Sequence, residues 1–136
     1  LLLIMNNSGT KIISGIVKPH KGNGRKFGYP TANIECPEEL DEGVFVGFTS
    51  LRLNDLSYDD LPSIIFVGFP ETLNENNKRL ETHIFDIRDE DLYDAHVEVT
   101  IVKKLRNNLK FDSIDDLIEQ MQDDEKDARA WFQSQA

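Results

Sequence analysis

The sequence contains a single cysteine, Cys36, among its 136 residues. One cysteine cannot form an internal disulfide, and without a second one it has no partner for a cysteine-based zinc site. A chain with so little cysteine is typical of a reducing compartment, so we expect a cytoplasmic protein.

Long hydrophobic runs are also missing. The only apolar run near an end of the chain is Leu1 to Met5, which is too short to cross a bilayer and has neither a charged flank nor a cleavage site. We therefore expect no membrane partner. Residues 1–10 are interpreted as an N-terminal tail or linker remnant, followed by one domain over residues 11–136.

Acidic residues are absent from the first 34 positions, although the whole chain has a net charge of −10. That segment holds five basic residues, whereas residues 35–136 hold 10 basic and all 25 acidic residues. The total charge argues against wholesale binding to a nucleic-acid backbone, which needs a basic surface. An anionic ligand is instead expected near the N-terminal quarter.

Alternating apolar residues predict a series of strands with no helix between them. The predicted strands cover residues 11–17, 43–53, 63–67, 80–87 and 96–102, and the segments 18–30, 54–60, 71–79 and 88–94 are expected to be loops or turns. Five or six strands in succession favour an antiparallel barrel or sandwich over a βαβ arrangement.

The C-terminal segment changes to a helical period. Ser113 and Asp116 have the spacing of a capping box, which predicts that a helix begins there. One face of this helix is predicted to be apolar, with Ile114, Leu117, Ile118, Met121, Ala128 and Phe132. The sequence therefore predicts one amphipathic helix that closes a β-barrel.

The segment from Ser14 to Ile34 is rich in glycine and basic residues. Gly22 and Gly24 allow the backbone to approach a ligand, and Arg25 and Lys26 add positive charge at the same point. Neither GxxxxGK[ST] nor GxGxxG is present. Generic motifs alone therefore favour neither a simple glycine loop nor a phosphate-binding loop for this segment.

The string from Gly24 to Ile34, with Pro-Thr-Ala-Asn at 30–33, resembles the signature of riboflavin kinases. The similarity continues in the same order through residues 43–47, 80–86, 91–93, 105–106 and 110–113. The resemblance implies a mainly β fold, a closed six-stranded antiparallel Greek-key-type barrel with a C-terminal helix. It also implies an enzyme that transfers the γ-phosphoryl group of ATP to the 5′-hydroxyl of riboflavin with Mg²⁺ and forms FMN and ADP. We expect a monomer without a nucleic-acid partner.

The resemblance also assigns roles to residues. Glu81 is implied as the catalytic base, Thr31 as a contact to phosphate and metal, and Asn33 as a metal ligand. The remaining nucleotide contacts are implied for the glycine loop, two backbone groups and a tyrosine, namely Gly22, Gly24, Arg25, Lys26, Ile84, Asp86 and Tyr93. Arg106 and Phe111 are implied on the flavin side.

Simpler interpretations stand beside these roles. Glu81 alone could be a solvated residue of an outer sheet face, and His83, two positions later, could either orient it or be a packed strand residue. Thr31 and Asn33 could serve turn chemistry after a proline. Phe111 could be a core residue that tethers the helix. His20 and His96 are interpreted as surface residues.

The chain departs from the family pattern at several positions. His20 and Asp94 stand where glycine is usual, Glu71 follows a proline that comes one place early, and Asn107 and Asn108 lie where an acidic residue is common. These changes motivate one alternative, a catalytically silent flavin- or nucleotide-binding barrel. A second alternative is a nucleic-acid-binding barrel that uses residues 18–26. The chain lacks an adenylyltransferase domain and is not expected to make FAD.

Overall fold

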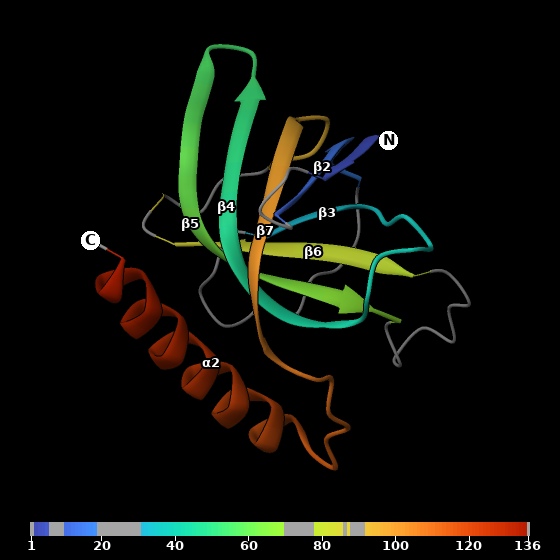
Figure 1. The fold of residues 1–136 in the computed structure, drawn as a ribbon. Coiled ribbons are helices and arrows are strands. Elements are labelled where there is room, and N and C mark those ends of the chain that lie inside the picture. Colours follow the sequence, from blue (N-terminus) through green and yellow to red (C-terminus); the bar gives the residue numbers. More distant parts are fainter. Residues whose placement is uncertain are drawn as a thin grey trace.

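The computed structural model describes residues 2–5, 10–18, 31–69, 78–85, 87 and 92–135. They form one antiparallel sheet and one long helix (Figure 1). The strands are β1 (Leu2–Met5), β2 (Lys11–Ile16), β3 (Thr31–Glu35), β4 (Gly43–Leu53), β5 (Leu56–Gly68), β6 (Arg79–Ile84) and β7 (His96–Arg106). The helix α2 spans Ile114–Ser134, and its N-cap is Ser113, whose side chain accepts a hydrogen bond from the Asp116 amide as predicted.

The sheet has the strand order β1-β2-β7-β4-β5-β6-β3 and curls strongly, so that its two ends approach each other (Figure 1). The Lys18 amide donates a hydrogen bond of 2.9 Å to the Asn33 carbonyl, which links the segment after β2 to β3. Within the described residues no strand ladder joins β2 to β3. The prediction of a mainly β barrel with one helix is confirmed, but the barrel is a curled half-barrel rather than a closed one.

Several predicted boundaries are wrong. Residues 54–60 were expected to be a turn, but only Asn54 and Asp55 form it, and β5 starts at Leu56. Leu56 and Tyr58 pack against the core between polar neighbours, so this stretch is a strand despite its polarity. β7 extends to Arg106 because it continues to pair with β4. Most of the predicted loops 18–30, 71–79 and 88–94 lie outside the described residues.

Two short strands were not predicted. The segment 31–35 forms β3, and residues 2–5 form β1, which pairs with β2 at one edge of the sheet. The described residues contain no helix whose length and apolar character would let it cross a membrane.

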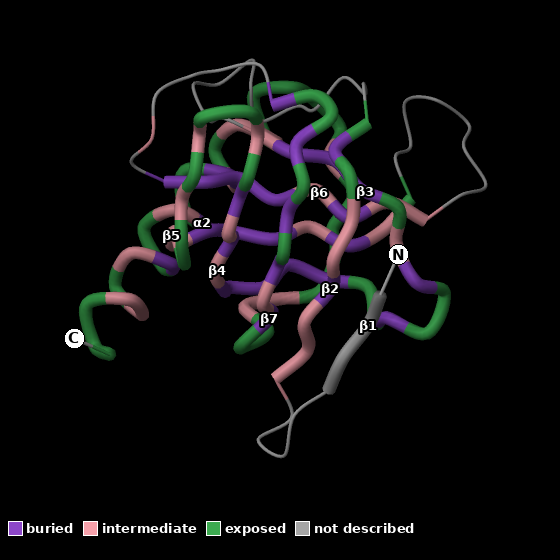
Figure 2. Tube along the Cα trace, turned by 90° about the horizontal axis from the view of Figure 1, so that it is seen from above, coloured by how far each residue is buried: buried purple, intermediate pink, exposed green. Residues whose placement is uncertain are grey.

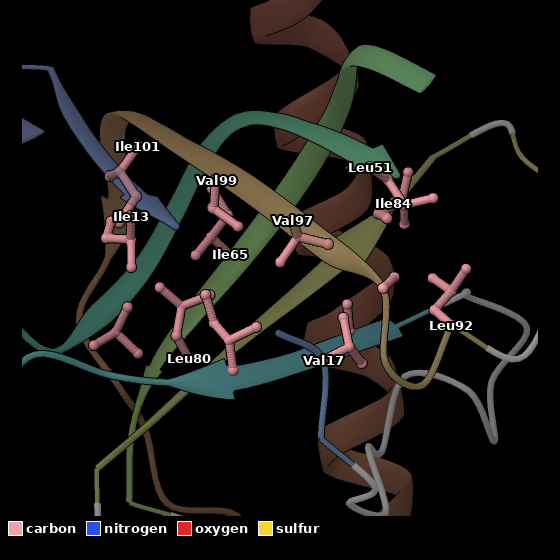
Figure 3. Packing of buried hydrophobic residues seen from close by; sticks show 14 of the residues in the cluster. Ile13, Val17, Leu51, Ile65, Leu80, Ile84, Leu92, Val97, Val99 and Ile101 are labelled. Carbon is pink, nitrogen blue, oxygen red and sulfur yellow. The ribbon is translucent and has the colours of Figure 1, made fainter. Parts of the chain in front are cut away.

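The main core fills the inside of the curled sheet (Figure 3). Inward-facing side chains of every strand from β2 to β7 contribute to it, and Figure 2 shows that the buried positions gather on the strands. They alternate with exposed or half-buried positions from His96 to Ile101 of β7, whereas residues 43–47 of β4 are all buried. Fully buried examples are Ile13, Ile34, Leu51, Ile65, Leu80 and Ile84.

A second apolar cluster lies on the outer face of the sheet, where α2 covers it. Val44, Val46, Ile64 and Phe85 of the sheet side pack with Ala128 of the helix, and Phe66, Leu105, Trp131 and Phe132 border them. The helix is buried through Met121, Ala128 and the aromatic residues near its end. The prediction for Ile114 was wrong, because this residue is 69% exposed in the first turn, before the part of the helix that meets the sheet.

A salt bridge joins the end of β7 to the middle of α2. The Arg106 guanidinium donates two hydrogen bonds to Asp124, Nε to Oδ1 at 2.8 Å and Nη2 to Oδ2 at 2.7 Å. The Asp124 side chain is 2% exposed and also accepts a hydrogen bond from Gln120. Such a bidentate pair fixes both distance and orientation, so it holds the helix against the barrel.

We predict that Asp124→Asn lowers the free energy of unfolding by about 3 kcal/mol, because the partly buried Arg106 loses its counter-charge. Urea denaturation measures this change. Asp123→Asn removes a charge at the adjacent, exposed position and serves as the matched control. Equal stability of the two variants would show that the pair does not hold the helix in place.

Gly47 lies where β4 passes close to β7. A Cβ atom at this position would lie 1.8 Å from the Thr100 carbonyl oxygen and 2.9 Å from Ile65 Cδ1. We predict that Gly47→Ala costs at least about 3 kcal/mol of unfolding free energy, because backbone would have to move. Gly15→Ala is the control, since its Cβ would come no closer than 3.3 Å to Ile34. Thermal denaturation of the two variants should show a large loss only at Gly47.

Candidate functional site

Polar side chains gather on the outer face of the sheet where β3 pairs with β6. The register places Thr31 opposite His83 and Asn33 opposite Glu81. Because Ala32, Ile34, Leu80 and Thr82 point into the barrel, the residues between them point outward. Directly opposed residues of antiparallel strands have neighbouring side chains, so these four polar groups lie together.

Asn33 is the most unusual member of this group. It is 3% exposed, and its side-chain oxygen Oδ1 is buried without a hydrogen-bond partner among the described residues. A buried carbonyl without a partner costs about 1–3 kcal/mol, so proteins rarely keep one that has no use. Asn33 is therefore a candidate position for a ligand contact.

The oxygens of Thr31 and Asn33 fit a hard cation. Their positions are two apart on β3, so the hydroxyl and the amide point to the same face. Mg²⁺ prefers such oxygen ligands, and it usually keeps water and takes further ligands from substrate phosphates. The described residues include no group of three or more His, Cys, Asp or Glu side chains placed around one metal position.

Glu81 is held by its neighbour on the same strand. His83 Nε2 lies 2.6 Å from Glu81 Oε1, and the two side chains are 5% and 18% exposed. The Phe66 ring packs on the His83 ring with a centroid distance of 4.5 Å. The Glu81 carboxylate is thus partly exposed and in contact with His83, and a carboxylate is a group that can accept a proton.

Behind Glu81, three hydroxyl groups form a buried network that sequence analysis missed. Thr49 Oγ1 lies 2.7 Å from Thr82 Oγ1 and 2.9 Å from Ser63 Oγ, and all three residues are fully buried. The network joins β4, β5 and β6, and so it helps to fix the strand that carries Glu81. The buried Asp124 was also missed, because an acidic residue in a helix rich in acids gives no signal of burial.

The predicted nucleotide contacts are only partly described. Gly22, Gly24, Arg25, Lys26 and Asp86 lie outside the described residues. The Ile84 side chain points into the core (Figure 3), which leaves its backbone for any contact with a ligand.

Tyr93 is 41% exposed in the turn before β7. The next residue, Asp94, has a φ of 68°, which is the left-handed conformation that glycine favours. Its amide donates to the Val17 carbonyl, at 3.0 Å, so the turn is attached to the end of β2. Asp94 therefore keeps the backbone shape that a glycine would give there.

On the predicted flavin side, all three nitrogens of the Arg106 guanidinium donate hydrogen bonds to neighbours in the protein. Nε and Nη2 bind Asp124, and Nη1 donates to the Asn107 carbonyl at 3.0 Å. Phe111 is half-buried between β7 and α2. Asn108 Nδ2 donates to the Val67 carbonyl at 2.9 Å, which ties this connection to the end of β5. The structure thus brings Thr31, Asn33, Glu81 and His83 together and places Arg106 in the helix attachment.

Two other features do not join this group. A hollow of about 720 Å³ lies over β2, β4, β5 and β7, lined in part by Ile16, Arg52 and His96, and it contains none of the predicted site residues. Burial raises the pKa of the Cys36 thiol to about 11, so this residue is a poor nucleophile near neutral pH.

Comparisons with known proteins identify the family of this chain. The family model for riboflavin kinase matches residues 10–132. The bifunctional riboflavin kinase/FMN adenylyltransferase of Escherichia coli is 34% identical over 122 residues, which are 88% of this chain and 37% of that protein. The human riboflavin kinase is 28% identical over 120 residues, 84% of this chain and 75% of that protein.

A solved structure of riboflavin kinase from Trypanosoma brucei has the same fold, with a TM-score of 0.69 at 21% identity over 91% of this chain and 80% of that one. The chain spans only about a third of the E. coli relative. Since the family model covers nearly the whole domain, from before β2 to the last turns of α2, the chain belongs to the riboflavin kinase family.

Proposed function

We propose that this chain phosphorylates riboflavin, with ATP as the donor, and produces FMN and ADP. The observation that carries the proposal is the β3–β6 pairing, which sets the buried, unpartnered Asn33 oxygen beside the accessible carboxylate of Glu81. One side of this pair suits a metal-bound phosphate, and the other suits an alcohol that must lose its proton.

In the proposed reaction, Glu81 accepts the proton of the ribityl 5′-hydroxyl while that oxygen forms a bond to the γ-phosphorus of ATP. The bond from the γ-phosphorus to the bridging oxygen breaks, and ADP leaves with the electron pair. Thr31 and Asn33 would hold Mg²⁺, and the bound ion would neutralise part of the negative charge of the phosphates. The fixed strands position both substrates, and this positioning accounts for much of the acceleration.

The remaining contacts are proposed from the family resemblance. Gly22, Gly24, Arg25 and Lys26 would surround the phosphates, and the backbone of Ile84 and Asp86 together with Tyr93 would seat the nucleotide. Phe111 would supply an apolar surface for the flavin. A flavin contact by Arg106 would have to coexist with its pair to Asp124.

Two alternatives remain distinguishable by experiment. A silent binding barrel would keep flavin and nucleotide affinity without forming FMN, and the presence of Thr31, Asn33 and Glu81 together argues against it. We propose that the chain has no nucleic-acid partner, because its net charge is −10, and that it is a monomer. Retention on single-stranded DNA that falls with added salt would contradict the first of these points.

Glu81→Gln should reduce kcat by about 10²–10⁴-fold and leave the binding of riboflavin and nucleotide intact, because the amide keeps the shape and loses the basic oxygen. Steady-state assays of FMN formation and titration calorimetry measure the two effects. Glu98→Gln, at an exposed position of β7, should retain the wild-type rate. A Glu81→Gln enzyme with a near-normal kcat would remove this residue from the role of base.

Asn33→Ala should weaken the stabilisation that Mg²⁺ and ATP give to the folded protein. A ligand at 100 times its Kd stabilises a protein by about 2.7 kcal/mol. The wild-type chain should therefore melt at a clearly higher temperature with Mg²⁺ and ATP than with ATP and EDTA. The variant should show little of this metal-dependent shift, and Asn107→Ala, at an exposed position, should show all of it. A full shift in Asn33→Ala would contradict the metal assignment.

A further inference from the structure

We infer that His83 is a positioning residue, which fixes the direction of the Glu81 carboxylate for proton transfer. The inference deepens the proposed function and rests on it. It is carried by the 2.6 Å contact between His83 Nε2 and Glu81 Oε1 and by the packing around the imidazole.

The contact has a defined direction. An ionised carboxylate can only accept hydrogen bonds, so with Glu81 ionised as a base must be, the donor is the tautomer of His83 that carries a proton on Nε2. The residues are two apart on β6, so both side chains leave the same face of the strand. A distance of 2.6 Å is short for a bond between nitrogen and oxygen, as is typical when one partner is charged.

Of the two side chains, His83 is the fixed one. It is 5% exposed, and its cross-strand partners are Thr31 on β3 and Ile64 on β5. The Phe66 ring lies on it at 4.5 Å, tilted by 40°. Phe66 also belongs to the outer cluster beneath α2, so the position of the imidazole is tied to the attachment of the helix.

Glu81 is the more exposed of the two side chains, at 18%, and a glutamate side chain has several rotamers available to it. Ordering such a side chain costs conformational entropy, and this cost would otherwise add to the activation free energy of the reaction. The buried imidazole orders the carboxylate in the folded protein, before a substrate arrives, so reacting atoms meet in a productive geometry.

The test compares His83→Leu with His83→Gln, whose amide nitrogen can replace the Nε2 donor. His83→Leu should lower kcat by about 10–100-fold with little change in KM for riboflavin or ATP, because misplacement of a catalytic group affects turnover more than affinity. His83→Gln should recover most of this loss. Ile64→Val is the control for packing, since it trims a buried neighbour of His83 and keeps the donor, and it should retain the wild-type kcat.

Wild-type turnover in His83→Leu, or an equal loss in folded His83→Leu and His83→Gln, would overturn the inference. If the leucine variant does not fold, nuclear magnetic resonance decides without it. The wild-type protein should show a slowly exchanging imidazole Nε2 proton that Glu81→Ala removes, and its absence in the wild type would equally overturn the inference. Failure of the base assignment is separate, because it would appear as normal turnover in Glu81→Gln whatever the His83 variants do.

Discussion

The pairing register of β3 with β6 determines which side chains enter the core and which form the candidate site. Side chains alternate between the two faces of a strand, so a slip by one residue would exchange every inward group for an outward one. In the observed register, Ala32 and Leu80 enter the core, and Asn33 and Glu81 meet on the outer face. The apolar residues of these strands thereby enforce the position of the polar ones.

Both faces of the sheet support this register. Inside, the hydroxyl network of Thr49, Ser63 and Thr82 joins β6 to its neighbours through specific hydrogen bonds rather than through apolar contact alone. Outside, Phe66 connects the His83 ring with the cluster that α2 covers. The Arg106–Asp124 salt bridge keeps that helix in place, although its two residues lie on β7 and α2 and the polar side chains of the site lie on β3 and β6. The C-terminal helix therefore contributes to the arrangement of the candidate site through packing.

Much of the fold follows from local sequence patterns. The alternation in β4 and the cap at Ser113 identified a strand and a helix start at their observed positions. Residues 54–60 misled the prediction, because a strand with one exposed face can be as polar as a turn. Strand order and the incomplete closure of the barrel depend on long-range pairing, which no local pattern reveals.

The candidate site was predictable in a different way. The resemblance selected Thr31, Asn33 and Glu81, but only the structure shows that β3–β6 pairing brings them to one face. It also shows Arg106 bound to Asp124, a contact between residues 18 positions apart that periodicity could not foresee. Buried polar pairs of this kind depend on tertiary contacts, so a helical pattern records Asp124 as one more solvated acid.

Riboflavin kinase activity is tested most directly by chromatographic separation of the products that the purified chain forms from riboflavin, ATP and Mg²⁺, with a parallel reaction in EDTA. We expect FMN and ADP in equal amounts in the first mixture and neither in the second. A folded chain that binds riboflavin and forms no FMN with any nucleotide and divalent metal would contradict this expectation, and would show that the site binds its ligands without reaction.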